Sequence, residues 1–209
     1  MQENQQPQTE VSTSQETSIE VTKTFEKSLF PTPLRCFSFN LNEEELNEFL
    51  AIYNQHNNET GNVNIMGIDN PLVEKFRGFV YSTCKQLEEF EDKENQDLKR
   101  LPEILGSSVF FQQPQEHVPL HCYEHVPLIL TFVLHTGQFP PNTYFADTRG
   151  GVQTIRQLVS NGLVATNYGI RARVGEIVVT PGYLQRYVET NLSDQAQVFL
   201  NVYVGFVNY

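Results

Sequence analysis

The chain has 209 residues, which is enough for one substantial domain with an appendage but too few for two ordinary domains. Its 25 acidic and 14 basic residues give a formal net charge of −11, and the basic residues are scattered, so we expect no nucleic-acid partner and no membrane partner. Three widely spaced cysteines, no apolar run near the roughly 18 residues of a membrane span and no signal-peptide pattern predict a soluble protein made in a reducing cytoplasm.

The first 26 residues are predicted to be an extended or disordered arm. They are rich in Gln, Glu, Ser and Thr, and they contain too little apolar surface to offset the entropy lost on ordering. A segment of this kind becomes ordered when it wraps around a partner. The rest of the chain, residues 27–209, is predicted to form one domain.

Two amphipathic helices are expected in the first half of that domain, after an edge strand predicted within 27–39. The first helix is predicted over 42–56, where Asn42 precedes three glutamates and apolar residues recur at i, i+3, i+4 and i+7 from Leu46. The second is predicted over 71–90, because an Asn-Pro pair is a typical helix start.

Short strands are predicted from about residue 107 to the end of the chain. Apolar segments such as SSVFF, LILTFVL and EIVVT are separated by proline and glycine at each expected turn. Helices followed by about seven strands indicate a mainly β (α+β) domain, an antiparallel sandwich or barrel that the two helices buttress.

The segment HVPLHCYEHVPL, residues 117–128, contains three evenly spaced histidines, His117, His121 and His125. On a helix they would share one face, but the two prolines of the segment exclude a helix. On a strand, four residues span about 13 Å, which is too far for a shared metal ion. A strand can chelate only through residues i and i+2, so the spacing does not predict a metal site by itself.

Several segments, in order, resemble the Fe(II)/2-oxoglutarate oxygenase-like proteins of tailed phages, which are related to prolyl hydroxylases. These segments are SLFPTPLRCFSFNLNEEELNEFL, VFFQQPQEHVPLHCYEH, NTYFADTRGG and VGEIVVTPGYLQRYVETN with QVFLNVYV. The resemblance covers most of residues 28–207. It implies a double-stranded β-helix, a jelly roll that holds iron at its open end.

The resemblance also implies where the iron ligands would lie. The first ligand matches His121, but its i+2 partner is Tyr123, where the family carries Asp or His. Glu124 could replace it only if the strand contained a bulge. The distal histidine of the family falls at Gln185 or Arg186, and no histidine follows residue 135.

The oxoglutarate-binding arginine of the family would lie in QAQVFLNV, which contains only glutamines as candidates. Arg186 is therefore the candidate for binding the oxoglutarate carboxylate, with Arg171 and Arg173 as the other basic residues nearby. Two histidines and a carboxylate are what hold Fe(II) while leaving positions open for co-substrates. The fold is thus indicated more strongly than the chemistry.

These observations leave two alternative hypotheses for the function. The first is a non-catalytic jelly-roll protein without a cofactor, which acts as a structural or adaptor component of a phage particle. It would be a virion protein made in the host cytoplasm and held by its arm to other subunits, which include further copies of the chain if the assembly is homo-oligomeric. The residues expected to contact these partners are Phe25, Leu29, Phe30, Phe206 and Tyr209.

The second function is an active Fe(II)/2-oxoglutarate-dependent dioxygenase with non-standard ligands. His121 with Glu124 or His125 would bind the metal, and Arg186 would bind 2-oxoglutarate. This alternative predicts iron binding and oxoglutarate-dependent formation of succinate.

Overall fold

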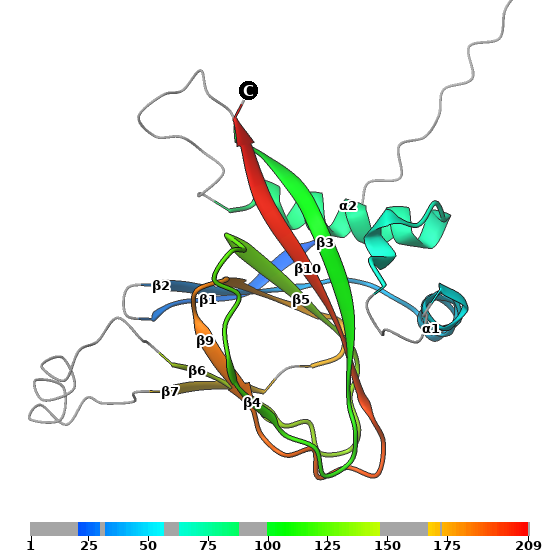
Figure 1. Ribbon diagram of the computed structural model, residues 1–209, viewed down its shortest axis with the longest axis vertical. Coiled ribbons are helices and arrows are strands. Elements are labelled where there is room, and N and C mark those ends of the chain that lie inside the picture. The colour runs from blue at the N-terminus through cyan, green and yellow to red at the C-terminus, as the bar shows by residue number, and fades with distance from the viewer. Residues whose placement is uncertain are drawn as a thin grey trace, which may run out of the picture.

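The computed structural model describes residues 21–29, 32–56, 63–87, 100–146, 167–171 and 173–208. They form two antiparallel sheets and two α-helices (Figure 1). The larger sheet contains, in spatial order, β1 (Thr22–Leu29), β2 (Thr32–Ser38), β8 (Glu176–Pro181), β5 (Leu128–His135), β10 (Gln197–Asn208) and β3 (Arg100–Gln112). The smaller sheet contains β4 (Val118–His121), β9 (Gln185–Val188), β6 (Asn142–Ala146) and β7 (Asn167–Arg171).

The connections between the strands define a jelly roll. From β3 to β6, and again from β7 to β10, successive strands alternate between the two sheets. Every strand pairs antiparallel with its neighbours. The predicted fold class, a double-stranded β-helix with two N-terminal helices, is therefore confirmed.

Both α-helices begin where the sequence predicts. At the start of α1 (Glu43–His56), the Glu45 N–H donates to Oδ1 of Asn42 at 2.8 Å and the Asn42 N–H donates to Glu45 Oε2 at 3.0 Å, a reciprocal cap. The helix α2 (Pro71–Lys85) begins after Asn70, whose side chain accepts from the Leu72 N–H at 2.7 Å. A short 3₁₀ turn, η1 (Ile65–Gly67), precedes it. No described helix is long and apolar enough to span a bilayer.

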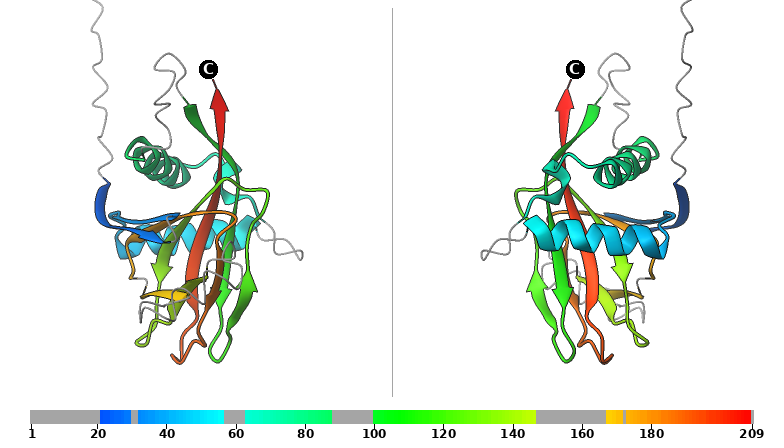
Figure 2. Two further views of the ribbon diagram at one scale, coloured as in Figure 1. Left: turned by 90° about the vertical axis from the view of Figure 1, so that its left-hand side faces the viewer. Right: turned by 90° about the vertical axis from the view of Figure 1, so that its right-hand side faces the viewer.

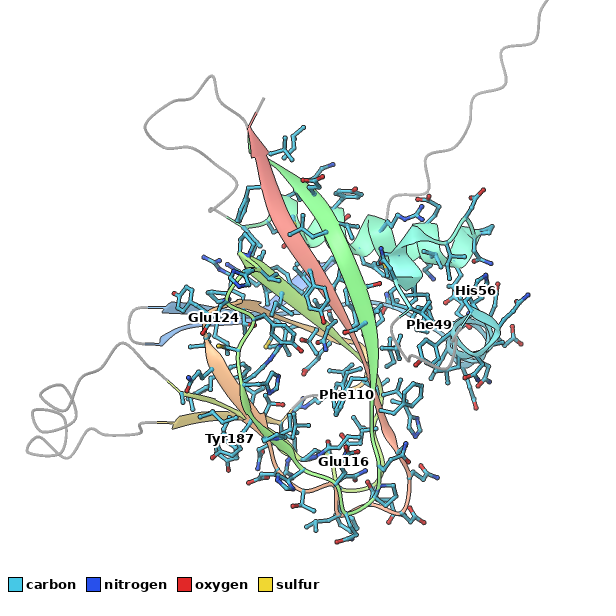
Figure 3. The ribbon with its side chains drawn as sticks, viewed as in Figure 1. Phe49, His56, Phe110, Glu116, Glu124 and Tyr187 are labelled. Atoms are coloured by element: carbon cyan, nitrogen blue, oxygen red, sulfur yellow. The ribbon has the colours of Figure 1, made fainter. Side chains whose placement is uncertain are left out.

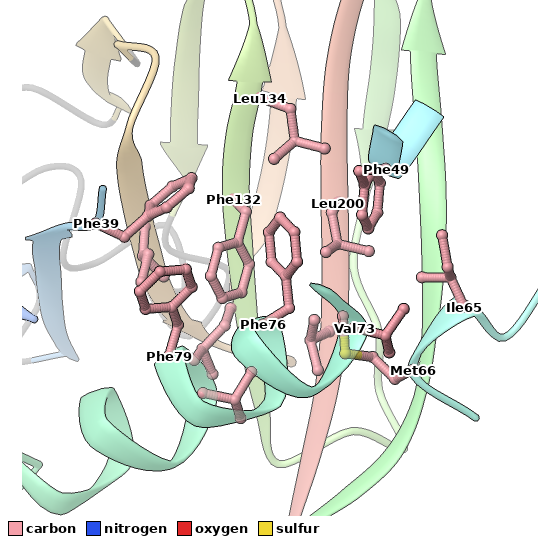
Figure 4. Packing of buried hydrophobic residues seen from close by; sticks show 14 of the residues in the cluster. Phe39, Phe49, Ile65, Met66, Val73, Phe76, Phe79, Phe132, Leu134 and Leu200 are labelled. Atoms are coloured by element: carbon pink, nitrogen blue, oxygen red, sulfur yellow. The ribbon is translucent and has the colours of Figure 1, made fainter. Parts of the chain in front are cut away.

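The helices cover one face of the larger sheet, and the smaller sheet lies on the other (Figures 1 and 2). An aromatic cluster fills the helix side, where the Phe76 ring lies 4.8 Å from that of Phe49 and 5.6 Å from that of Phe132 (Figure 4). Figure 3 shows Phe49 and Phe110 on opposite sides of β3. The central strands are thus buried on both faces, which explains why β5 reads as the nearly continuous apolar run LILTFVL.

Several element boundaries differ from the predicted ones. The single edge strand predicted within 27–39 is a pair of strands, β1 and β2, and β1 is the edge. Because β1 begins at Thr22, the predicted arm, residues 1–26, overlaps this strand, and residues 1–20 lie outside the described residues.

Two further boundaries were wrong. The second helix ends at Lys85, before the predicted end near residue 90, and the side chain of Gln86, its C-cap residue, donates to the Val21 carbonyl at 2.5 Å. The strand β3 begins at Arg100, well before residue 107, because it pairs with β10 along its whole length. The strand contains Pro102, which is tolerated because β3 lies at the edge of the larger sheet.

Candidate functional site: a cavity between the sheets

A cavity of about 420 Å³ lies between the two sheets. Its walls are mostly apolar, with Phe110, Val133 and Phe199 from the larger sheet and Phe145 from the smaller one. The polar groups that reach it include Ser108, His121, Tyr123, Thr131, Arg186 and Asn201. No Asp or Glu is among the described residues that line it.

His121 and Tyr123 both line the cavity, as the i and i+2 positions of an extended segment should. The His121 ring meets the Tyr123 ring edge-on at 5.4 Å. Nδ1 of His121 lies 2.8 Å from the Pro119 carbonyl oxygen. Since a carbonyl oxygen can only accept a hydrogen bond, Nδ1 is the donor. Burial lowers the pKa of His121, and the nearby charge of Arg186 lowers it further, against the effect of the Pro119 bond. The net effect favours the neutral form of the His121 ring.

Arg186 faces His121 across the pairing of β4 with β9. Its side chain is 7% exposed, and its guanidinium lies over the Tyr123 ring at 4.8 Å. Nη1 donates to Oγ1 of Thr131 at 3.2 Å, whereas Nη2 is buried without a hydrogen-bond partner among the described residues. Burial lowers the pKa of Arg186, and the neighbouring phenols of Tyr123 and Tyr203 act in the opposite direction. A guanidinium nonetheless stays protonated in proteins.

Hydrogen bonds connect the hydroxyl and amide groups on the larger sheet. Thr131 Oγ1 lies 2.8 Å from Asn201 Oδ1, so the Thr131 hydroxyl donates to this amide oxygen while it accepts from Arg186. Ser108 and Tyr203 share a hydrogen bond of 2.7 Å, and burial raises the pKa of the Tyr203 phenol. The polar side of the cavity is therefore a fixed array of neutral groups around one cation.

Glu124 and His125 lie elsewhere. Both are exposed, and neither lines the cavity (Figure 3 labels Glu124). The chain turns after Tyr123, whose carbonyl accepts from the Val126 N–H at 3.1 Å, and Gly182 packs against this turn. The turn directs the chain away from His121, so the structure does not gather His121, Glu124 and His125 into one site.

The donor groups of the described residues do not make the ligand set of a catalytic iron. Within the described ranges, no three His, Cys, Asp or Glu side chains come together as metal ligands. Tyr123, a neutral phenol, occupies the position where the resemblance implies a carboxylate, and Arg186, which has no lone pair to offer, lies where it implies the distal histidine. Of the two candidates for that position, Arg186 faces the cavity and Gln185 does not line it.

Thr131, Asn201 and Ser108 were not predicted from the sequence as parts of the site. A signal was present, because Thr131 and Asn201 each interrupt an otherwise apolar strand, LILTFVL and QVFLNVYV. A polar residue within a strand that is buried on both faces requires a polar partner. The two positions pair directly across β5 and β10.

The predicted partner-contact residues stay largely untested. Phe25 and Leu29 belong to β1, but their side chains lie outside the described part of the structure, as do Phe30 and Tyr209 entirely. Phe206 is half-buried and packs against the main core. Its side chain therefore contributes to the domain itself.

A scan against protein-family models finds no match, and no curated protein matches the sequence. An oxidoreductase of the 2OG-Fe(II) oxygenase family from Burkholderia pseudomallei superposes with a TM-score of 0.53 at 10% identity, over 79% of each chain. The viral collagen prolyl hydroxylase of Paramecium Bursaria Chlorella virus-1 superposes with a TM-score of 0.55 at 9% identity, over 82% of this chain and 89% of that one. HygX from Streptomyces hygroscopicus, with nickel and 2-oxoglutarate bound, superposes with a TM-score of 0.55 at 9% identity, over 83% of this chain and 82% of that one.

At these identities the likeness shows the fold alone. The chain has the jelly-roll architecture of 2OG-Fe(II) oxygenases, and its cavity lies between the two sheets of that fold. Chemistry depends on the side chains that line such a cavity. Those side chains are the basis for the function proposed next.

Proposed function

We propose that the protein is non-catalytic: it keeps the oxygenase-type jelly roll but does not hold a catalytic iron. The observation that carries this proposal is the buried guanidinium of Arg186, which faces His121 inside the cavity. A fixed positive charge repels Fe(II) and supplies no ligand atom. His121 alone does not make the set of two histidines and one carboxylate that retains Fe(II).

An anaerobic Fe(II) titration tests this proposal directly. We expect no stoichiometric binding by the wild-type protein, no difference between wild type and His121→Ala, and no succinate from 2-oxoglutarate. Co(II) provides a second readout, because its visible absorption reports ligands from the protein. Stoichiometric binding that His121→Ala abolishes, together with succinate formation, would overturn the proposal.

That opposite result would favour the second candidate, an Fe(II)/2-oxoglutarate-dependent dioxygenase with non-standard ligands. The observations in its favour are the fold likeness and the position of His121 in the cavity. Glu124→Gln and His125→Ala would then separate the possible ligands, because each should lower iron affinity if its side chain reaches the metal. His117→Ala is a matched control, since His117 is an exposed histidine that does not line the cavity.

We propose further that the protein is a structural or adaptor component of a phage particle, held by its arm to other subunits. This part is supported by the composition of the arm and by the net charge of −11. The protein should sediment with a large assembly from the cells that produce it, and deletion of residues 1–20 should release it.

The deletion ends at residue 20 for a structural reason. Val21 is buried, and its carbonyl accepts from Gln86 at 2.5 Å, so a longer truncation would damage the domain. The truncated protein should keep its thermal unfolding temperature. A full-length protein that stays monomeric in every fraction would contradict the assembly role.

The predicted contact residues can be tested without truncation. Phe30→Ser and Tyr209→Ser should weaken association with the assembly, or with further copies of the chain, because aromatic side chains often anchor interfaces. Leu192→Ser is the matched control, since Leu192 is 67% exposed and lies between β9 and β10. Sedimentation velocity separates the two kinds of partner.

A further inference from the structure

Among the described residues that line the cavity, one is a buried cation and none is an anion. Arg186 is 7% exposed, and no Asp or Glu is among the described residues that line the cavity. A buried charge costs free energy unless a counter-charge or a full set of hydrogen bonds stabilises it. The cation–π contact with Tyr123 and the bond to Thr131 satisfy it in part, while Nη2 has no partner among the described residues.

The neighbouring amide provides a second donor. Because Oδ1 of Asn201 takes the hydrogen of the Thr131 hydroxyl, the group that Asn201 can offer to a ligand is its Nδ2 amide. Asn201 lines the same cavity as Arg186, and Thr131 connects the two by hydrogen bonds. An acidic group offers two acceptor oxygen atoms, so it can accept from two donors of this kind at once.

Apolar side chains line much of the rest of the cavity, which is spacious. Val133 and Phe199 pack with Phe110 on the larger sheet, and Phe145 and Ile170 line the side formed by the smaller sheet. The volume of about 420 Å³ equals the liquid volume of roughly fourteen waters, far more than one inorganic anion needs. Among the described lining residues no second cation is present, so a second carboxylate would have no partner of opposite charge.

We propose that this cavity binds a small organic monocarboxylate. Arg186 and Asn201 hold the carboxylate, and an aromatic or branched aliphatic body fills the apolar space between the sheets. This assignment rests on the proposed absence of iron, because the guanidinium then takes the role of the positive centre in the cavity. The same features predict discrimination against 2-oxoglutarate and succinate, which carry two carboxylates.

Calorimetric titration and thermal shift in the presence of EDTA test the assignment. The probes are monocarboxylates of about four to ten carbons, among them 3-phenylpropionate, with its neutral amide, 2-oxoglutarate and inorganic phosphate as comparisons. At least one monocarboxylate should bind one-to-one, and about tenfold or more tightly than its amide, because a charge-assisted pair with arginine is lost in the amide. Arg186→Met should abolish this binding, and Arg186→Lys should weaken it by losing the planar fork.

Arg173→Met is the matched control, because Arg173 is exposed and its loss changes the net charge equally. It should bind the monocarboxylate as the wild type does. Four results would each overturn the assignment. The acid and its amide bind with equal affinity, or phosphate or 2-oxoglutarate binds as tightly as every monocarboxylate. Alternatively, Arg186→Met binds the monocarboxylate as the wild type does, or no monocarboxylate binds at all. If no monocarboxylate binds in EDTA and the Fe(II) titration is also negative, the monocarboxylate assignment is refuted but the non-catalytic function is not. If 2-oxoglutarate binds only in the presence of Fe(II), both the assignment and the proposed function are refuted.

Discussion

The backbone of Gly182 lies directly against the turn that follows Tyr123. The Tyr123 N–H donates to the Gly182 carbonyl at 2.8 Å, and the Gly182 N–H donates to the Pro127 carbonyl at 3.2 Å. A Cβ atom at residue 182 would overlap the carbonyl oxygen of Val126 and lie 2.5 Å from that of Tyr123. This close approach of two backbones requires glycine, and it holds Tyr123 at the cavity.

Gly182→Ala should therefore lower the free energy of unfolding by about 1 to 3 kcal/mol, because the turn must move to relieve the overlap. Denaturant unfolding measures the change. Gly106→Ala is the control, since its nearest neighbour is the Tyr203 ring at 3.8 Å, an ordinary contact. An alanine at residue 182 that unfolds like the wild type would contradict the packing described.

Arg186→Met should raise the free energy of unfolding of the ligand-free protein by about 1 to 3 kcal/mol, because it removes an incompletely partnered buried charge while keeping the side-chain length.

Thr131→Val should lower the free energy of unfolding by about 1 to 3 kcal/mol, because Arg186 and Asn201 both lose a partner. Chemical unfolding of both variants provides the values.

The two changes should not be additive. In the Arg186→Met background, Thr131→Val leaves only Asn201 without its partner, so it should cost less than in the wild type. A double-mutant cycle measures this coupling. Strict additivity would show that the bond between Thr131 and Arg186 contributes nothing.

Glu45→Gln should weaken the contact between the two helices above acidic pH. The Glu45 carboxylate accepts from Lys75 at 2.5 Å and from the Asn42 N–H at 3.0 Å, and these bonds, Lys75 first, lower the pKa of Glu45. A carboxyl whose folded pKa is lowered adds stability above its ordinary pKa, 4.5, and loses it as the pH falls through the folded value. The expected loss near pH 7 is up to about 1 kcal/mol, because the pair is partly exposed.

Thermal unfolding between pH 3 and 7 measures this effect. Wild type and Glu45→Gln should differ at neutral pH and converge in acid, whereas Glu48→Gln, an exposed control on the same helix, should follow the wild type throughout. A constant difference at every pH would assign the effect to lost packing and not to charge.

In the native protein, iodoacetamide should modify Cys122 and spare Cys36 and Cys84. Burial raises the pKa of both Cys36 and Cys84 to about 12, aided at Cys36 by the charge of Glu176, so almost no reactive thiolate forms. Cys122 is half-buried. Mass spectrometry should find a single label in the native wild type, none in native Cys122→Ser and all thiols labelled after denaturation; early labelling of Cys84 would contradict the packing of α2.

The sequence predicted the fold where local signals and burial agree. Asn70 and Pro71 define the start of α2 by chemistry that acts within one turn. The start of β3 near Arg100 was missed, because its partner on β10 lies about a hundred residues away and only that pairing makes a strand of a segment containing Pro102. Pairing between distant strands carries no local signature.

For the candidate site, the sequence left one position open between two neighbouring residues, Gln185 and Arg186. Sequence comparison alone left Gln185 and Arg186 as equal candidates for the distal position. Adjacent strand residues point to opposite faces, so only the register of β9 against His121 selects Arg186. The partners Thr131 and Asn201 could not be assigned before the pairing of β5 with β10 was known.

The positions of Tyr123 and Arg186 also make this chain a starting point for engineering. Both side chains line the same cavity as His121, on a scaffold that superposes on HygX with nickel and 2-oxoglutarate bound. Tyr123→Asp and Arg186→His together would create two histidines and one carboxylate, the ligand set of a non-haem iron centre. Two amino-acid substitutions would thus convert the native lining of the cavity into a designed metal site. The metal affinity of the double variant would show how much of the affinity of such a site comes from the ligand side chains alone.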